Sequence, residues 1–70
     1  MDRQSVRSSN ISSIGYDEKN EILEIEFLSG GIYQYLDVPV NVYEELMDAD
    51  SHGKYFNEYI KEIYKTKKIR

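Results

Sequence analysis

The stretch that decides the fold is EILEIEF, residues 21–27, in which apolar and charged side chains alternate. Leu23, Ile25 and Phe27 therefore share one face of a strand, and the two glutamates between them share the other. We expect the apolar face to be buried. The glutamates are expected to form a solvated surface.

A further strand is predicted on each side of this stretch. Residues 10–16 carry well-spaced apolar groups and are followed by polar turn residues at 17–20. On the other side, residues 29–31 include two glycines suited to a tight turn, and residues 32–37 return as a third strand. Three strands joined by short turns make an antiparallel meander, whose apolar face needs a cover.

Two helices are predicted to supply that cover. Asn41 and Glu44 have the spacing of a capping box, and a helix is expected from there to about Ala49. Asp50 or Ser51 is expected to cap a second helix that packs on the sheet. The apolar stripe of this second helix is Tyr55, Phe56, Tyr59, Ile60, Ile63 and Tyr64.

The predicted fold class is therefore α+β, in the order β-β-β-α-α, with both helices on one face of the sheet. The chain of 70 residues is expected to form one domain. Residues 1–9 are expected to be a flexible N-terminus, and residues 66–70 a basic C-terminal tail.

Charge is unevenly distributed along the chain. Of nine Lys and Arg side chains, five lie in residues 61–70, but only one of thirteen Asp and Glu side chains does. The first sixty residues thus carry four basic and twelve acidic side chains. An acidic body repels phosphate backbones, so we expect any contact with an anion to be local.

The inventory of reactive residues argues against an enzyme. The chain has no cysteine and a single histidine, His52. These counts exclude a disulfide framework, a cysteine nucleophile and a His-rich metal site, and Ser51 beside His52 is not a catalytic triad. Residues 29–31 lack the helix and lysine of a phosphate-binding loop. We expect no catalytic residue, no metal and no cofactor.

The same composition suits a reducing compartment. A chain without cysteine fits the cytosol, and no stretch approaches the roughly 20 apolar residues of a membrane span. Residues 1–10 are polar and do not resemble a signal peptide. We expect a cytoplasmic protein that does not contact a membrane.

The sequence resembles the KTSC domain family, which is named after the C-terminal extension of some lysyl-tRNA synthetases and includes stand-alone bacterial and phage proteins. The resemblance covers nearly the whole chain. It rests on the order and spacing of Ile14-Gly15-Tyr16, residues 23–27, Ser29-Gly30-Gly31, Tyr33-Gln34-Tyr35, Val38-Pro39 and residues 49–57. The function that the resemblance implies is RNA binding, which has been suggested for the family.

The first candidate site is the expected N-terminus of the second helix, Ser51-His52-Gly53-Lys54, which we call the helix mouth. Unpaired backbone N–H groups and the helix dipole favour an anion there, and Gly53 would let a ligand approach the backbone. His52 and Lys54 would add charge-assisted hydrogen bonds to a phosphate or carboxylate. The alternative is that Ser51 only caps the helix while Gly53 packs against a neighbouring element.

The second candidate site is the pair Tyr33 and Tyr35, which share one face of the third strand. Exposed rings on a sheet can stack on unpaired bases, and Tyr16 would extend such a platform. Tyrosines at this spacing are more often half-buried core, and we expect at least one of them to be core. The face they occupy depends on whether Ile32 and Leu36 take the inside.

Three functions remain open for a non-catalytic binding module with these two candidate sites. It binds RNA on Tyr33, Tyr35 and the basic tail, or it binds a phosphate-bearing nucleotide at the helix mouth. In the second case it would be a phage-type protein that sequesters a nucleotide signal as a homo-oligomer. The third function is a protein-interaction domain with an exposed tyrosine patch.

Overall fold

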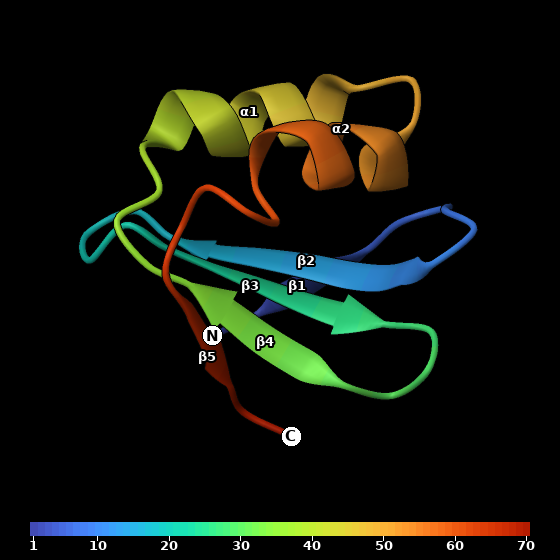
Figure 1. The fold of residues 1–70 in the computed structure, drawn as a ribbon, viewed down its shortest axis with the longest axis horizontal. Coiled ribbons are helices and arrows are strands. Elements are labelled where there is room, and N and C mark those ends of the chain that lie inside the picture. Colours follow the sequence, from blue (N-terminus) through green and yellow to red (C-terminus); the bar gives the residue numbers. More distant parts are fainter.

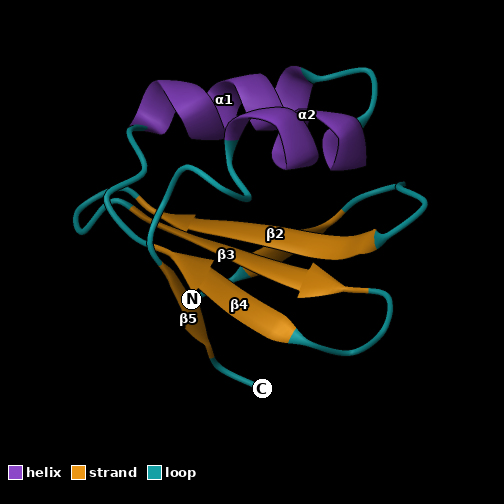
Figure 2. Ribbon diagram, in the orientation of Figure 1, coloured by secondary structure: helices purple, strands orange, loops and turns teal.

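A five-stranded antiparallel sheet and two helices make up the structure, a computed structural model that describes residues 1–70 (Figure 1). The elements are β1 (Arg3–Ser5), β2 (Ile11–Asp17), β3 (Ile22–Phe27), β4 (Ile32–Tyr35), α1 (Val40–Asp48), α2 (His52–Tyr59) and β5 (Thr66–Lys68). The strands lie in the sheet in chain order, and both helices cover the same face (Figure 2). Neither helix is long and apolar enough to cross a membrane.

The predicted α+β class and central meander are confirmed, but the predicted number of strands was wrong. Residues 1–9 and 66–70, expected to be a flexible N-terminus and a basic tail, each contribute a three-residue edge strand. β1 pairs with residues 13–15 of β2, and β5 pairs with residues 33–35 of β4. Short polar edge strands lack an alternating apolar pattern because both their side-chain rows are largely solvated, so the sequence pattern did not reveal them.

The core lies between the sheet and the helices. Paired residues share a face, so Ile14, Ile25 and Tyr33 form one row beneath the helices. The alternation predicted for residues 21–27 is confirmed, because Leu23 and Ile25 are fully buried. The side chains with less than 2% of their surface exposed are Ile11, Ile14, Leu23, Ile25, Val38, Leu46 and Ile60.

The helix ends differ from the predicted ones. Helix α1 begins one residue after Pro39, whose side chain makes no capping hydrogen bond, so the capping box predicted for Asn41 was wrong. The fixed φ of proline sets the entry to the helix, and its carbonyl accepts the first helical N–H, from Val42. Helix α2 ends at Tyr59 because the backbone turns at Ile60 toward β5.

The early end of α2 changes which residues reach the sheet. Phe56 and Ile60 are buried as predicted, but Tyr59 and Ile63 are 55% and 65% exposed. Ile63 lies beyond the end of α2, where helical periodicity no longer sets the face of a side chain, and Tyr59 is the last residue of the helix. Tyr64, also beyond the helix, still packs against the core.

The uncovered face of the sheet carries a polar network in place of the expected solvated glutamates. Glu24 is only 6% exposed; it pairs with the Arg3 guanidinium and accepts a hydrogen bond from Gln34 Nε2 at 2.8 Å. Ser13 Oγ accepts from Arg3 Nε and donates to Glu26, both at 2.9 Å. The expectation of a solvated surface was wrong for Glu24, because β1 brings Arg3 over it.

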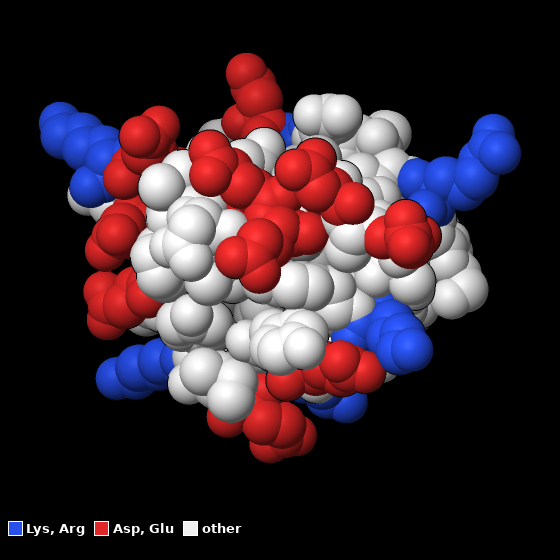
Figure 3. All heavy atoms as spheres, turned by 90° about the horizontal axis from the view of Figure 1, so that it is seen from above, with Lys and Arg blue, Asp and Glu red and all other residues white.

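The two sides of the molecule also differ in charge. Seen from the helix side, carboxylates gather over the helices, whereas most Lys and Arg side chains lie around the rim (Figure 3). The exposed acidic residues of α1, α2 and the segments beside them are Glu44, Glu45, Asp48, Asp50, Glu58 and Glu62. An anionic ligand is therefore disfavoured over the helices and must approach from another side.

Candidate functional site

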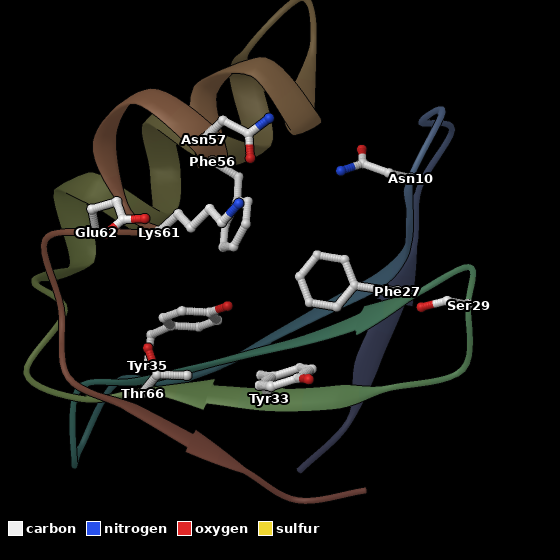
Figure 4. A pocket seen from close by; sticks show the side chains of 10 residues that line it. All are labelled: Asn10, Phe27, Ser29, Tyr33, Tyr35, Phe56, Asn57, Lys61, Glu62 and Thr66. Carbon is white, nitrogen blue, oxygen red and sulfur yellow. The ribbon is translucent and has the colours of Figure 1, made fainter.

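An open groove of about 470 Å³ lies between β4 and α2 (Figure 4). Its aromatic lining residues are Phe27, Tyr33, Tyr35 and Phe56, and its polar ones are Asn10, Ser29, Asn57, Lys61, Glu62 and Thr66. We call it the aromatic groove. It exists because α2 ends before it covers the β4 side of the sheet, and the chain then passes around this side to reach β5.

Tyr33 and Tyr35 both point to the helix-covered face of the sheet, because they pair with Ile25 and Leu23 of β3. Ile32, which competed with them for that face, pairs with Glu26 on the other one. Tyr35 is 4% exposed and belongs to the core, whereas Tyr33 is half-buried. The expectation that at least one of the pair is core is confirmed.

The aromatic rings of the groove form a chain of edge-to-face contacts. Phe27 meets Tyr33 with 5.7 Å between ring centroids and Phe56 with 5.5 Å. Phe56 also meets Tyr35, at 5.3 Å. Pairs of this kind contribute about 0.5–1.5 kcal/mol each beyond the area that they bury. The chain of contacts fixes Tyr33 against a rigid support.

The hydroxyl of Tyr35 stays protonated at neutral pH. Desolvation by burial, with a smaller contribution from Tyr33, raises the pKa of Tyr35 to about 12. Its O–H group points into the groove (Figure 4). A neutral hydroxyl can donate a hydrogen bond to a ligand as well as accept one.

Two lysines stand beside the groove. Lys61 lines it, and Lys68 Nζ lies 6.0 Å from the centroid of the Tyr33 ring. Lys68 pairs with Tyr33 in the sheet and so shares its face, whereas Lys67 pairs with Gln34 and takes the opposite face. Arg70 also reaches that opposite face, where its guanidinium lies 3.5 Å from Glu26. The basic C-terminal segment is thus divided between the two faces of the sheet.

The residues predicted at the mouth of α2 do not line the aromatic groove. Of the two predicted caps, Asp50 and Ser51, the structure has Ser51 as the N-cap, and its Oγ accepts a hydrogen bond from Lys54 N at 3.2 Å. His52 Nδ1 lies 2.8 Å from the carbonyl oxygen of Leu46, which ties the ring to the end of α1. Gly53 is buried against the segment before β2. Both observations fit the alternative prediction, in which Ser51 caps the helix and Gly53 packs against a neighbouring element.

Tyr16 does not extend the tyrosine pair. Its ring stacks on that of Tyr43 in α1, with 4.7 Å between centroids and 8° between planes. Its hydroxyl donates to the carbonyl oxygen of Val38 at 2.5 Å. Tyr16 therefore fixes α1 to the sheet.

Sequence reasoning missed several residues of the groove. Phe27 and Phe56 were predicted as core residues, and the structure places one edge of each in the core and another in the groove. Asn10 and Asn57 carried no signal at all, because single asparagines outside a motif are common in turns and on helix surfaces. No group of three or more His, Asp and Glu side chains is arranged to hold a metal ion.

Comparison with known proteins identifies the family. The profile of the KTSC domain matches residues 7–64. An uncharacterised protein of Stutzerimonas stutzeri is 46% identical over 61 residues, which are 87% of this chain and 86% of that protein. The crystal structure of a KTSC domain protein from Yersinia pestis superposes with a TM-score of 0.96 at 46% identity, covering 99% of this chain and 97% of that one.

Larger proteins contain the same domain. A lysine–tRNA ligase of Nostoc punctiforme is 41% identical over 61 residues, which are 87% of this chain but only 11% of the ligase. The chain belongs to the KTSC domain family, as the sequence resemblance predicted. This is a domain of unknown function that occurs in some lysyl-tRNA synthetases and in stand-alone proteins.

Proposed function

We propose that the domain is a non-catalytic module that binds single-stranded RNA and holds one unpaired base in the aromatic groove. The observation that carries this proposal is the position of Tyr33, a half-buried ring on the floor of an open groove with Lys61 and Lys68 beside it. RNA-binding sheets stack unpaired bases on aromatic side chains in this way. The groove volume also falls within the roughly 300–1,000 Å³ of small-ligand clefts.

The charge distribution supports one direction of approach. The carboxylates over the helices repel a phosphate backbone, whereas β5 and the residues before it carry Lys65, Lys67 and Lys68. A strand of RNA would therefore run along the β5 edge and direct one base inward. Lys61 and Lys68, which face the groove, would contact the phosphates on either side of that base.

The relatives favour RNA over a free nucleotide. Several proteins that contain a similar domain are lysine–tRNA ligases, whose named substrate is an RNA. A groove that is open along one side also suits a chain that continues beyond the bound base. A free nucleotide bound by a homo-oligomer is expected in an enclosed cavity that buries most of its surface.

A second candidate function is supported by exposed apolar side chains on α2 and the turn after it. Tyr59 and Ile63 are 55% and 65% exposed, and the Tyr59 ring lies 4.8 Å from that of Tyr55. Exposed aromatic residues of this kind are typical of protein interaction surfaces. This surface is where the predicted protein-interaction domain would have its exposed tyrosine patch.

Binding of RNA in the aromatic groove can be tested with two matched variants. Fluorescence anisotropy with labelled hexaribonucleotides of A, C or U should show binding that Tyr33→Ala weakens about tenfold or more, from the loss of base stacking. Tyr59→Ala makes the same chemical change outside the groove and should bind as the unmodified protein does. Tighter binding of mononucleotides than of hexamers would favour the free nucleotide. Equal binding by both variants and the unmodified protein would exclude the groove.

A further inference from the structure

The Asn10 side chain stands at one wall of the aromatic groove, opposite Asn57 of α2 (Figure 4). Its backbone is fixed as well, because the Asn10 carbonyl oxygen accepts a hydrogen bond from Leu28 N at 2.9 Å. Asn10 is thus tied to the residue that follows β3. The orientation of its amide group then decides what it offers to a ligand.

Hydrogen bonds around Ser8 determine that orientation. Ser8 Oγ accepts from the backbone N–H groups of Asn10 at 3.3 Å and of Ile11 at 3.2 Å. A hydroxyl has two acceptor positions and one proton, so its remaining group is the O–H donor. That proton goes to Asn10 Oδ1, 3.1 Å away. The carbonyl end of the amide is therefore directed to Ser8, and the NH2 end is left free.

Gly53 packs against the same amide group of Asn10. A Cβ atom at position 53 would lie 2.3 Å from Asn10 Oδ1 and 3.3 Å from its Cγ, so any side chain there would force the Asn10 amide to move. The Asn10 amide occupies the space that glycine leaves. Figure 4 shows the Asn10 nitrogen turned toward the interior of the groove. This contact gives Gly53 a role in the fold that needs no anion at the helix mouth.

We infer that Asn10 is the specificity-determining hydrogen-bond donor of the aromatic groove, and that Ser8 and Gly53 are its positioning residues. This inference rests on the proposed function. The Asn10 NH2 group donates to an acceptor, a carbonyl oxygen or an unprotonated ring nitrogen, on the edge of a base stacked at Tyr33. Across the groove, the Asn57 carbonyl oxygen faces inward and accepts from the base (Figure 4).

Two asparagine variants test the donor directly. Asn10→Asp and Asn57→Asp add the same negative charge to the groove, but only the first replaces a donor by an acceptor. We expect Asn10→Asp to weaken hexaribonucleotide binding about fivefold more than Asn57→Asp does, which corresponds to one lost neutral hydrogen bond. Raising the salt concentration should reduce the loss that the two share and leave the difference between them.

Gly53→Ala tests the positioning. The added methyl meets the end of the Asn10 side chain, which can rotate away, so the fold should be kept. We expect Gly53→Ala to weaken binding about as much as Asn10→Ala does, and the double variant to be no weaker than either. In nitrogen-resolved NMR spectra without RNA, Gly53→Ala should shift the side-chain NH2 signals of Asn10.

The outcomes separate this inference from the proposed function. If Tyr33→Ala abolishes binding while Asn10→Asp and Asn57→Asp lose equally, the groove binds RNA but Asn10 is not its donor. Unshifted Asn10 NH2 signals in Gly53→Ala, or additive effects of the two single variants, would overturn the positioning role. If no hexaribonucleotide binds the unmodified protein, the proposed function fails, and the inference about Asn10 fails with it.

Discussion

The rings of Tyr35 and Phe56 meet edge to face with 5.3 Å between their centroids, and this contact joins the floor of the aromatic groove to helix α2. Tyr33, two residues earlier on the same strand face, has no contact of this kind with α2 and stays half-buried. The two tyrosines therefore have separate roles. Tyr35 supports the fold, and Tyr33 keeps part of its ring exposed in the groove.

This division predicts different effects on stability. Tyr35→Ala removes a large buried side chain and should cost about 3–5 kcal/mol, most of the stability expected of a small domain. Tyr33→Ala should cost clearly less, because part of its ring is already solvated. Urea denaturation followed by circular dichroism would measure both. Equal losses would show that Tyr33 is as much a part of the core as Tyr35.

A second prediction concerns the polar network on the uncovered sheet face. Desolvation alone would raise the pKa of Glu24, but hydrogen bonds from Gln34 and Arg3 and the charge of Arg3 outweigh it and lower the pKa below 4.5. Glu24 therefore contributes stability that is complete above pH 4.5 and is lost as the pH falls through its lowered pKa.

Glu24→Gln should remove this contribution. We expect a loss of about 1–3 kcal/mol near pH 7, and a loss that shrinks as the pH falls through the lowered pKa of Glu24 and the wild-type carboxylate takes up its proton. Urea unfolding at about pH 7 and about pH 3 would measure it. Glu18→Gln makes the same change in an exposed turn and should stay within about 0.5 kcal/mol of the unmodified protein. A Glu24→Gln loss that does not depend on pH would contradict the network.

A third prediction uses two neighbouring lysines of β5. Lys68 shares the face of Tyr33, whereas Lys67 takes the opposite face, so Lys68→Gln and Lys67→Gln form a matched pair. Lys68→Gln should weaken RNA binding and make the plot of log affinity against log salt concentration shallower by about 0.7, as expected for one lost phosphate contact. If Lys67→Gln has the larger effect, RNA binds the other face of the sheet.

A fourth prediction separates the aromatic groove from the helix mouth. The side chain of Lys54 does not line the groove, and its backbone N–H is already bonded to Ser51. Lys54→Ala should therefore leave hexaribonucleotide binding within about twofold of the unmodified protein. A loss as large as that of Tyr33→Ala, seen by the same anisotropy titration, would restore the helix mouth as the binding site.

The central part of the fold could be predicted because its residues follow simple periodic patterns. Alternation in residues 21–27 placed Leu23 and Ile25 in the core, and the glycines after it placed the turn to β4. The edge strands could not be predicted in this way, because residues 3–5 and 66–68 are polar throughout. Their positions depend on backbone pairing with β2 and β4, which is not encoded in side-chain alternation.

The candidate site was only partly predictable. The spacing of Tyr33 and Tyr35 predicted that both share one face. Their difference in burial depends on where α2 ends, and the apolar stripe predicted for this helix extended past that point. The groove wall at Asn10 depends on its contact with Gly53, which lies more than forty positions away in the sequence. No local sequence pattern predicts such a contact. Gly53 was predicted either to let a ligand approach the backbone or to pack against a neighbouring element, and the structure packs it against the Asn10 side chain.

The most direct test of the central claim is NMR chemical-shift mapping of the isotope-labelled protein with the three hexaribonucleotides. Binding in the aromatic groove predicts that the largest shifts cluster at Asn10, Tyr33, Lys61 and Lys68, and that they shrink in Tyr33→Ala. Shifts confined to the acidic helix surface or to Tyr59 and Ile63, or no shifts with any hexamer, would contradict RNA binding in this groove.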